Sequence, residues 1–538
     1  MMLRSRLAVG LTLAAVIGAV GVSLWALRRD PHPDRLNVLV IVWDTVRADR
    51  LSLYGHDVPT TPKLDVRAET ALVFEQATAP AMWTLPTHAS MFTGQFATTH
   101  GAVASYRWLD HHHTTLAEHL GEAGYDTFAF TSNLVASPLT NLLQGFETVH
   151  TTYPRQGVKR GRYVRASREA TEAKLLANDE STEISPSFMG DDRERWGRAV
   201  HKDAAPVIAQ GLLEWLSERP NPRQPWFAYL NLMEAHSPRV PSAKARAQVM
   251  PPRVRARALQ VDQSLFAANE YIIGQRRYTK AEWAAIRGVY DATLVDLDDA
   301  TEALFKALDR AGDLDHTLVI LLADHGEHLG EHQRLEHRWS LHQPLLHVPL
   351  VVWDPGQPGR RISERVSTAG LFATVLDRVG LPVPEATQAP SWFIEPDDER
   401  IYAQLLDPFV SQLAAMREAY PYVDFAPYAE TYCAAFEGDL KLLYGSSGRR
   451  ELFHLGRDPN ERRDLGKVAV RKREALVEAL HAWEDGLTPY DPGLRTEADG
   501  RGANRQDAAE QRMLAALGYV VSEPTPMERL RCTIRTSP

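Results

Sequence analysis

Residues 37–44 read N-V-L-V-I-V-W-D, a continuous apolar run that ends in a carboxylate. Unbroken apolar runs of this length are typical of strands that are buried on both faces of a parallel sheet. Asp44 would then stand at the carboxyl end of the strand, where open α/β sheets bind their ligands. Taken alone, Asp44 is more simply explained as a residue that caps the following turn.

The same alternation of helix and strand continues along the chain. Further strands are predicted at 125–131, 226–233, 316–323 and 348–353, and helices at 115–123, 204–218 and 280–311. Two stretches without periodicity, 151–200 and 239–275, are predicted to be surface excursions. The sequence therefore predicts an α/β catalytic domain over residues 35–395.

The pattern changes near residue 395. Short antiparallel strands are predicted within 430–455 and a closing helix at 469–487. Residues 396–487 are thus predicted to form a smaller antiparallel α+β subdomain, followed by a polar tail at 488–538.

Composition excludes several classes of protein. The chain has 538 residues, 44% of them hydrophobic and 24% charged, as in globular proteins. A net charge of −9 without a basic stripe excludes a nucleic-acid partner. Two cysteines, Cys433 and Cys532, exclude a disulfide framework and a cysteine-rich zinc site, and leave one disulfide between them open.

Residues 7–27 form an uncharged apolar run with arginines on both flanks. As a helix this run would span roughly 30 Å, enough for one bilayer crossing. It predicts an uncleaved transmembrane anchor with the catalytic domain outside the cytoplasm, periplasmic or extracellular. A cleaved signal peptide is the alternative.

Residues 83–94 read W-T-L-P-T-H-A-S-M-F-T-G and predict a helix from Pro86 to about Thr93, ended by Gly94. The hydroxyl of Thr84 would lie at the helix N-terminus, where free amides and the macrodipole favour an anion. Thr84 is therefore a candidate nucleophile toward a phosphate or sulfate ester. This segment alone favours the simpler interpretation of Thr84 as a helix cap.

Three predicted strands end in potential ligands: Asp44, His236, and Asp324 with His325. A divalent cation held there would lower the pKa of the Thr84 hydroxyl and polarise the ester. One imidazole among oxygen ligands favours Mn²⁺ or Zn²⁺ over Ca²⁺, and the identity of the metal stays open.

Several histidines lie outside this ligand set. His236 and His337 are suited to bind substrate oxygens or to protonate a leaving group, although either could be an ordinary hydrogen-bonded histidine. His328 and His332 are predicted to be peripheral.

These residues carry a resemblance to the sulfatases of the alkaline-phosphatase superfamily. The match runs from about residue 36 to 520, with gaps at the two excursions, and its motifs occur in the family's order. The segments that carry it are 37–55, 61–65 (T-P-K-L-D), 84–94, 100–101, 124–127, 233–238 (M-E-A-H-S-P), 323–332 (A-D-H-G-E-H-L-G-E-H), 347–352 and 451–465.

The resemblance implies a mixed sheet flanked by helices, with a smaller antiparallel C-terminal subdomain. It also implies Asp44, Asp324 and His325 as ligands of one divalent ion, which the nucleophile Thr84 would share. His236 falls on the family's substrate-binding histidine. His337 follows the D-H-G-E segment as a histidine does in the superfamily's phosphoethanolamine transferases.

Three positions depart from the family pattern. Sulfatases carry Cys or Ser in C/S-x-P-x-R and convert it to formylglycine, whereas this chain reads T-x-P-x-H. No formylglycine is expected, and His88 takes the arginine's place among the catalytic candidates. Asn133 stands where the family has the lysine of G-K-W-H and becomes a candidate for substrate binding. Thr45 replaces an aspartate that many members have.

A formylglycine hydrate expels sulfate by collapsing to the aldehyde, which a threonine cannot do. The sequence therefore predicts a metal-dependent hydrolase of a sulfate or phosphate ester, with Thr84 as nucleophile and phosphoryl chemistry favoured. One alternative is a membrane-anchored phosphotransferase that moves a phospho-headgroup from a lipid onto a glycan. Another is an inactive binding protein of the same fold, which the intact ligand set argues against.

Overall fold

The computed structural model describes residues 35–153, 204–396 and 398–504, and a few residues between 163 and 170. Within these residues nine strands form one large sheet. β1 (Asn37–Trp43) lies at its centre, parallel to both β5 (Trp226–Leu232) and β6 (Thr317–Leu322). The side chains of residues 38–43 are fully buried, so the predicted two-sided burial of this strand is confirmed.

The remaining strands extend the sheet in both directions. Beyond β5 lie β3 (Asp126–Thr131) and β4 (Thr148–Thr151). Beyond β6 lie β10 (Leu350–Trp353), β2 (Leu72–Thr78) and β11 (Arg360–Ser367). The short strand β9 (His347–Val348) pairs with β2. β10 and β9 run antiparallel to their neighbours, so the sheet is mixed as predicted.

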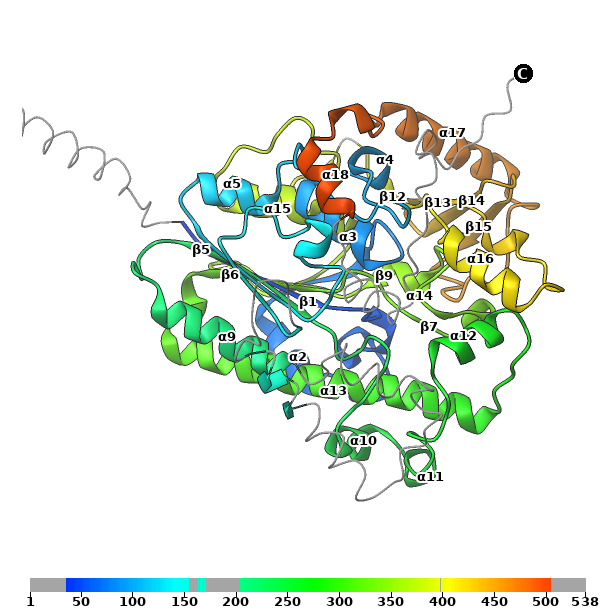
Figure 1. Ribbon diagram of the computed structural model, residues 1–538, viewed down its shortest axis with the longest axis horizontal. Coiled ribbons are helices and arrows are strands. Elements are labelled where there is room, and N and C mark those ends of the chain that lie inside the picture. The colour runs from blue at the N-terminus through cyan, green and yellow to red at the C-terminus, as the bar shows by residue number, and fades with distance from the viewer. Residues whose placement is uncertain are drawn as a thin grey trace, which may run out of the picture.

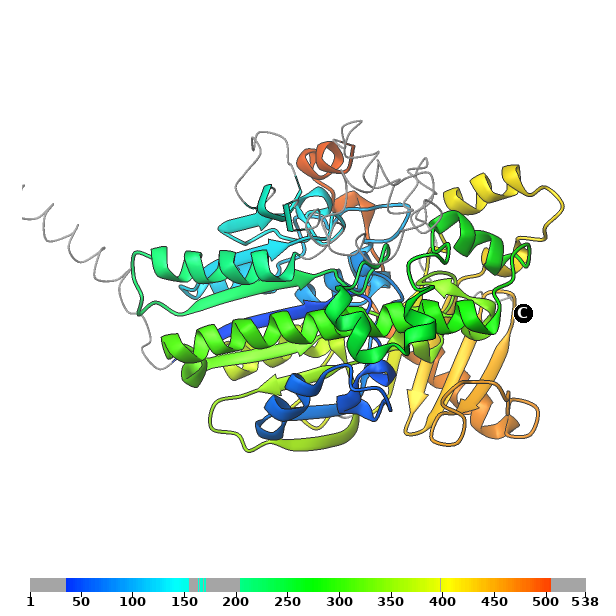
Figure 2. The same ribbon diagram turned by 90° about the horizontal axis from the view of Figure 1, so that it is seen from below.

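Helices cover both faces of the sheet (Figure 1). The long helix α13 (Lys280–Ala311) packs beside α9 (Ala205–Glu218) on one face, as Figure 2 also shows. The opposite face carries α3 (Thr84–Thr93), α5 (Leu116–Glu122) and α15 (Leu371–Arg378). Further helices are α2 (Pro62–Arg67), α4 (Ala97–His100), α14 (Gln343–Leu346) and α16 (Val410–Ala419).

The stretch 239–275, predicted to be irregular, contains three short helices. They are α10 (Ala243–Val249), α11 (Pro252–Arg255) and α12 (Leu265–Ile272). The side chains of Ser242 and Ser264 cap α10 and α12 by accepting a backbone hydrogen bond. The prediction was wrong because helices of one or two turns contain too few residues to show a 3.6-residue period.

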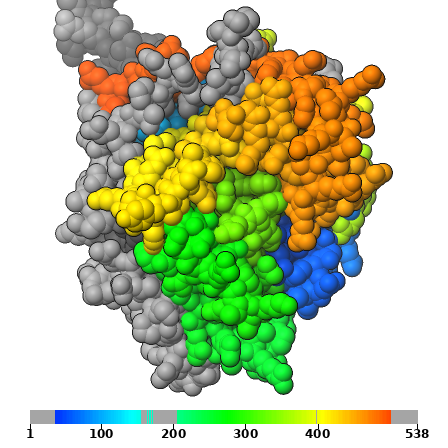
Figure 3. Space-filling model, turned by 90° about the vertical axis from the view of Figure 1, so that its right-hand side faces the viewer, coloured from blue at the N-terminus to red at the C-terminus, as the bar shows by residue number. Residues whose placement is uncertain are grey.

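The C-terminal subdomain is built on a separate antiparallel sheet, as predicted. Its strands, in spatial order, are β12 (Ile401–Leu405), β13 (Tyr432–Glu437), β14 (Leu440–Gly445) and β15 (Arg450–His454). α17 (Val470–Gly486) packs against β13, β14 and β15. Figure 3 shows this subdomain, in yellow and orange, beside green segments of the catalytic domain.

The described part of the predicted polar tail folds back onto the catalytic domain. The amide of Tyr490 donates to the carbonyl of Thr98 at 2.7 Å. Asp499 in α18 (Glu497–Asn504) accepts a hydrogen bond of 3.1 Å from the indole of Trp108. These contacts hold residues 490–499 against α4 and the loop that follows it.

Several predictions lie wholly or mostly outside the described residues. They are the anchor at 7–27, the surface excursion at 151–200, the tail beyond residue 504, and the pairing of Cys433 with Cys532, of which only Cys433, buried in β13, is described. Within the described ranges, no helix combines the length and the apolar character that crossing a membrane requires.

Candidate active site

The carboxyl ends of β1, β5 and β6 meet at one edge of the large sheet, as expected for parallel neighbours. Asp44 follows β1, while Asp324 and His325 follow β6. One ligand atom from each of these three residues lies within 4.8 Å of the others, and all three side chains are fully buried. The structure thus brings together the three predicted metal ligands.

Hydrogen bonds hold one atom of each carboxylate and leave the other for a cation. Oδ2 of Asp44 accepts from Nδ2 of Asn133 at 2.6 Å and of Asn231 at 3.2 Å. Oδ1 of Asp324 accepts from the amides of Thr45 at 3.2 Å and His325 at 2.8 Å. Among the described residues, Oδ1 of Asp44 and Oδ2 of Asp324 have no hydrogen-bond partner.

The imidazole of His325 completes the set. Its Nδ1 donates to the carbonyl of Gly326 at 2.9 Å, so Nε2 carries the lone pair. Two buried carboxylate oxygens and one imidazole nitrogen fit a divalent cation such as Mn²⁺ or Zn²⁺.

The electrostatics of the cluster favour such a cation. Burial, with the charge of Asp324 added, raises the pKa of Asp44 to about 6, and burial raises the pKa of Asp324 to about 7. Burial also lowers the pKa of His325 to about 4, so this ring is neutral near pH 7. When bound, a divalent cation would compensate the two carboxylates, polarise an ester and stabilise the alkoxide of Thr84.

Thr84 faces this cluster from the start of α3. The helix begins at Thr84, earlier than predicted, and Trp83 occupies the N-cap position without a side-chain cap. Oγ1 of Thr84 lies 3.4 Å from Nε2 of His325 and 3.4 Å from Nδ2 of Asn133. The simpler interpretation of Thr84 as a helix cap is therefore wrong. Gly94 ends the helix at φ 68°, as predicted.

His88 lies beneath the site, one turn after Thr84 on α3. Its Nδ1 donates to the carbonyl of Thr84 at 2.9 Å and lies 3.7 Å from Oδ2 of Asp324. The ring is fully buried edge-on to Tyr229, and burial lowers its pKa to about 3. His88 is thus placed to position Thr84 and Asp324.

His236 and His337 lie together beside the predicted metal ligands. The ring centroid of His337 is 4.5 Å from that of His325 and 5.1 Å from that of His236. Nδ1 of His236 lies 2.6 Å from the carbonyl of Ser237, and Nδ1 of His337 lies 3.1 Å from Oε1 of Glu327. Because these contacts occupy Nδ1, Nε2 is the nitrogen of each ring that remains for a substrate.

Sequence reasoning assigned no role in the site to two residues, Thr45 and Asn231. Thr45 adopts a left-handed turn at φ 61°, held by the hydroxyl of Tyr290, which donates to its carbonyl at 2.7 Å. This turn aims the amide of Thr45 at Asp324. Asn231 could have been recognised, because an amide side chain near the carboxyl end of an otherwise apolar buried strand needs a polar partner.

The chain is similar to several known proteins. A family model described as Sulfatase matches residues 36–381. The multifunctional alkaline phosphatase superfamily protein PehA of Trinickia caryophylli is 26% identical over 65% of this chain and 75% of its own length. The arylsulfatase of Clostridium perfringens is 20% identical over 84% of this chain and 96% of its own length.

A solved structure shows the same fold. The phosphonate monoester hydrolase of Agrobacterium radiobacter superposes with a TM-score of 0.63 and 22% identity, covering 84% of this chain and 96% of that one.

Proposed function

The chain belongs to the sulfatase family of ester hydrolases, and we propose that within this family it cleaves phosphate or phosphonate esters with Thr84 as nucleophile. The observation that carries the proposal is the direction of the Thr84 side chain. Its hydroxyl points from the N-terminus of α3 toward His325 and Asn133, beside the two carboxylates, and makes no capping bond.

The chemistry of threonine supports a phosphoryl substrate. Oγ1 of Thr84 would form a bond to phosphorus while the bond to the leaving oxygen breaks, giving a phosphothreonine. Water then attacks phosphorus in line, the P–Oγ1 bond breaks with its electron pair going to Oγ1, and Oγ1 takes up a proton to restore the hydroxyl of Thr84. A formylglycine hydrate releases its sulfate by elimination. A sulfate ester of Thr84 could not use this route, because threonine carries a single hydroxyl and cannot form an aldehyde.

The neighbouring residues have distinct tasks in this scheme. Asn133 donates to Asp44 and lies within reach of Oγ1 of Thr84, so its amide holds the carboxylate beside the nucleophile. The free amides at the start of α3 favour the anionic phosphoryl oxygens. His236 and His337 lie beside the cluster, suited to bind the remaining oxygens and to give the leaving alkoxide its proton.

The names of the relatives cover both chemistries, since one is an arylsulfatase and the superposed structure is a phosphonate monoester hydrolase. They support ester hydrolysis and do not decide between a sulfate ester and a phosphate or phosphonate ester. The replacement of the family's Cys or Ser by Thr84 is what favours phosphorus over sulfur.

The test is a comparison of esters with one leaving group. Purified protein loaded with Mn²⁺, Zn²⁺ or Ca²⁺ is assayed on an aryl phosphate, an aryl phosphonate, a phosphodiester and an aryl sulfate. We expect phosphoryl turnover to exceed sulfate turnover with the best metal. Sulfate release without phosphoryl turnover would contradict the proposal, and preferential transfer to an added alcohol would identify a phosphotransferase.

We further propose that residues 7–27 anchor the catalytic domain to a membrane, with the domain outside the cytoplasm. The length and flanks of this apolar run support the proposal.

A further inference from the structure

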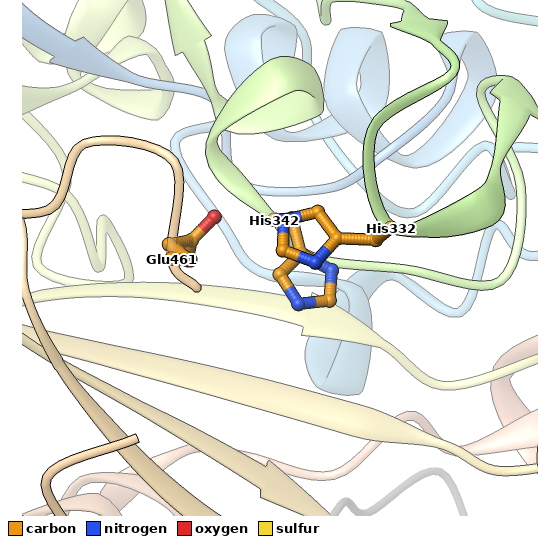
Figure 4. A group of neighbouring side chains, drawn as sticks. All are labelled: His332, His342 and Glu461. Carbon is orange, nitrogen blue, oxygen red and sulfur yellow. The ribbon is translucent and has the colours of Figure 1, made fainter. Parts of the chain in front are cut away.

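A second group of potential metal ligands lies where the C-terminal subdomain meets the catalytic domain. His332 belongs to the turn η7 (Glu331–Gln333), and His342 immediately precedes α14. Glu461 comes from the loop that follows β15. One ligand atom of each residue lies within 4.8 Å of the others. Figure 4 shows the two imidazoles next to each other, opposite Glu461 on its separate loop.

The two imidazoles stack closely, with ring centroids 3.8 Å apart and an angle of 17° between the planes. Nδ1 of His342 is hydrogen-bonded to Oγ of Ser340 at 2.6 Å, which leaves Nε2 for a ligand. Hydrogen bonds of this kind orient the histidines of metal sites.

Glu461 is also held in place. Its Oε2 accepts from the amide of Gln343 at 2.6 Å, and its Oε1 accepts from Nζ of Lys441 at 2.5 Å. Lys441 offsets the charge of the carboxylate, so the imidazoles would supply most of the attraction for a cation. A site of this kind favours a cation that prefers nitrogen, such as Zn²⁺, over Ca²⁺ or Mg²⁺.

A neighbouring histidine supplies an independent observation. His328 in β7 (His328–Leu329) is fully buried, and neither of its ring nitrogens has a hydrogen-bond partner within the described part of the chain. Its ring centroid lies 6.4 Å from that of His332 and 6.3 Å from that of His342. A buried polar group without a partner in a folded protein indicates a water or an ion that belongs beside it.

The backbone at two of the three residues is also unusual. His332 has φ 52° and Glu461 has φ 51°, the left-handed region that residues other than glycine rarely adopt. Such conformations persist where the surroundings hold them, as a bound ion would.

We propose that His332, His342 and Glu461 bind a second divalent cation, Zn²⁺ or one of similar ligand preference, separate from the ion at Asp44, Asp324 and His325. The second ion would join the segment 332–342, which carries His337, to the loop after β15 in the C-terminal subdomain. Its role would be structural.

The test measures metal content and does not depend on catalysis. The full chain is saturated with Zn²⁺, freed of excess metal by dialysis, and analysed for zinc per chain by mass spectrometry. We expect two equivalents in the wild type and one in the double variant His332→Ala/His342→Ala. His316→Ala, which removes an exposed histidine from η6 (Leu314–His316), is the matched control and should retain both.

Two further measurements keep the proposal falsifiable. Glu461→Gln preserves the size of the side chain, so its zinc content can be measured if the double variant does not fold, and it should bind the second equivalent at least tenfold more weakly. In crystals of the wild type soaked in Zn²⁺, anomalous scattering should show a peak among the three side chains. Unchanged zinc content in both variants, or an anomalous peak at Asp44 and Asp324 alone, would overturn the proposal.

Discussion

Nδ2 of Asn133 donates a hydrogen bond of 2.6 Å to Oδ2 of Asp44, where both side chains are buried at the end of β1. The same nitrogen lies 3.4 Å from Oγ1 of Thr84. A neutral amide therefore joins a proposed metal ligand to the proposed nucleophile, at the position where the resemblance places a lysine.

Asn133→Ala should lower kcat/KM roughly 10- to 100-fold, because a hydrogen bond to a charged group contributes about 1.5–3 kcal/mol. Steady-state kinetics with saturating metal measure the effect. Asn221→Ala, in the loop before β5, is the control and should retain wild-type rates. Equal rates for both variants would remove Asn133 from the site.

Thr84→Ala should lose nearly all activity, by about a thousandfold or more, equivalent to roughly 4 kcal/mol of barrier. Thr84→Ser should retain much of it, because only the hydroxyl is required. Trapping at low pH followed by peptide mass spectrometry should find phosphate on the peptide that contains Thr84. A fully active Thr84→Ala variant would show that another group is the nucleophile.

Metal binding should stabilise the protein more at high pH than at low pH. The pKa of Asp44 is raised to about 6 and that of Asp324 to about 7, from an ordinary value of 3.8. In the metal-free protein each raised pKa contributes stability that is fully present below about pH 4 and is lost as the pH rises through the folded value. A divalent cation would bind the ionised carboxylates and displace these protons.

Calorimetry should therefore show a larger rise in Tm on adding Mn²⁺ at about pH 8 than at about pH 5. Asp324→Asn should lose most of this rise at both pH values, because it removes one ligand. A rise in Tm that is the same at both pH values in the wild type would show that protons do not compete with the metal.

Gly326→Ala should destabilise the loop that follows the ligands Asp324 and His325. A Cβ atom at Gly326 would lie 2.0 Å from the carbonyl oxygen of Pro344 and 3.0 Å from Cγ of Arg47. Overpacking of this kind costs about 1–3 kcal/mol, measured as the free energy of unfolding in urea. Gly121→Ala is the control, because its Cβ would meet no atom within 4 Å and alanine favours a helix.

Deleting residues 1–30 should release the protein from the membrane fraction and leave a folded catalytic domain, because β1 and the rest of the described fold begin after this segment. Fractionation with and without the segment measures this. Mature protein whose N-terminus begins within 19–28 would show that the segment is a cleaved signal peptide.

Local sequence by itself determined the central strand, the carboxylate that follows it and the long helix α13. Burial on both faces of a strand and a sustained 3.6-residue period are properties of consecutive residues, so a single stretch shows them. The order of the motifs likewise identified the family and predicted Asp44, Asp324 and His325 as metal ligands.

Only the tertiary structure decided which way several of these side chains point. Whether Thr84 caps α3 or faces His325 depends on one turn of backbone at the helix start, which short-range propensities do not specify. The roles of Thr45 and Asn231 follow from contacts between strands that are distant in the chain.

The group formed by His332, His342 and Glu461 shows most clearly that local sequence does not specify contacts between distant residues. His332 was predicted to be peripheral, and more than a hundred residues separate it from Glu461. No local pattern links residues so far apart, because their proximity arises from the packing of the C-terminal subdomain against the catalytic domain. The sequence determined which side chains are available, and the packing of the two domains decided which of them meet.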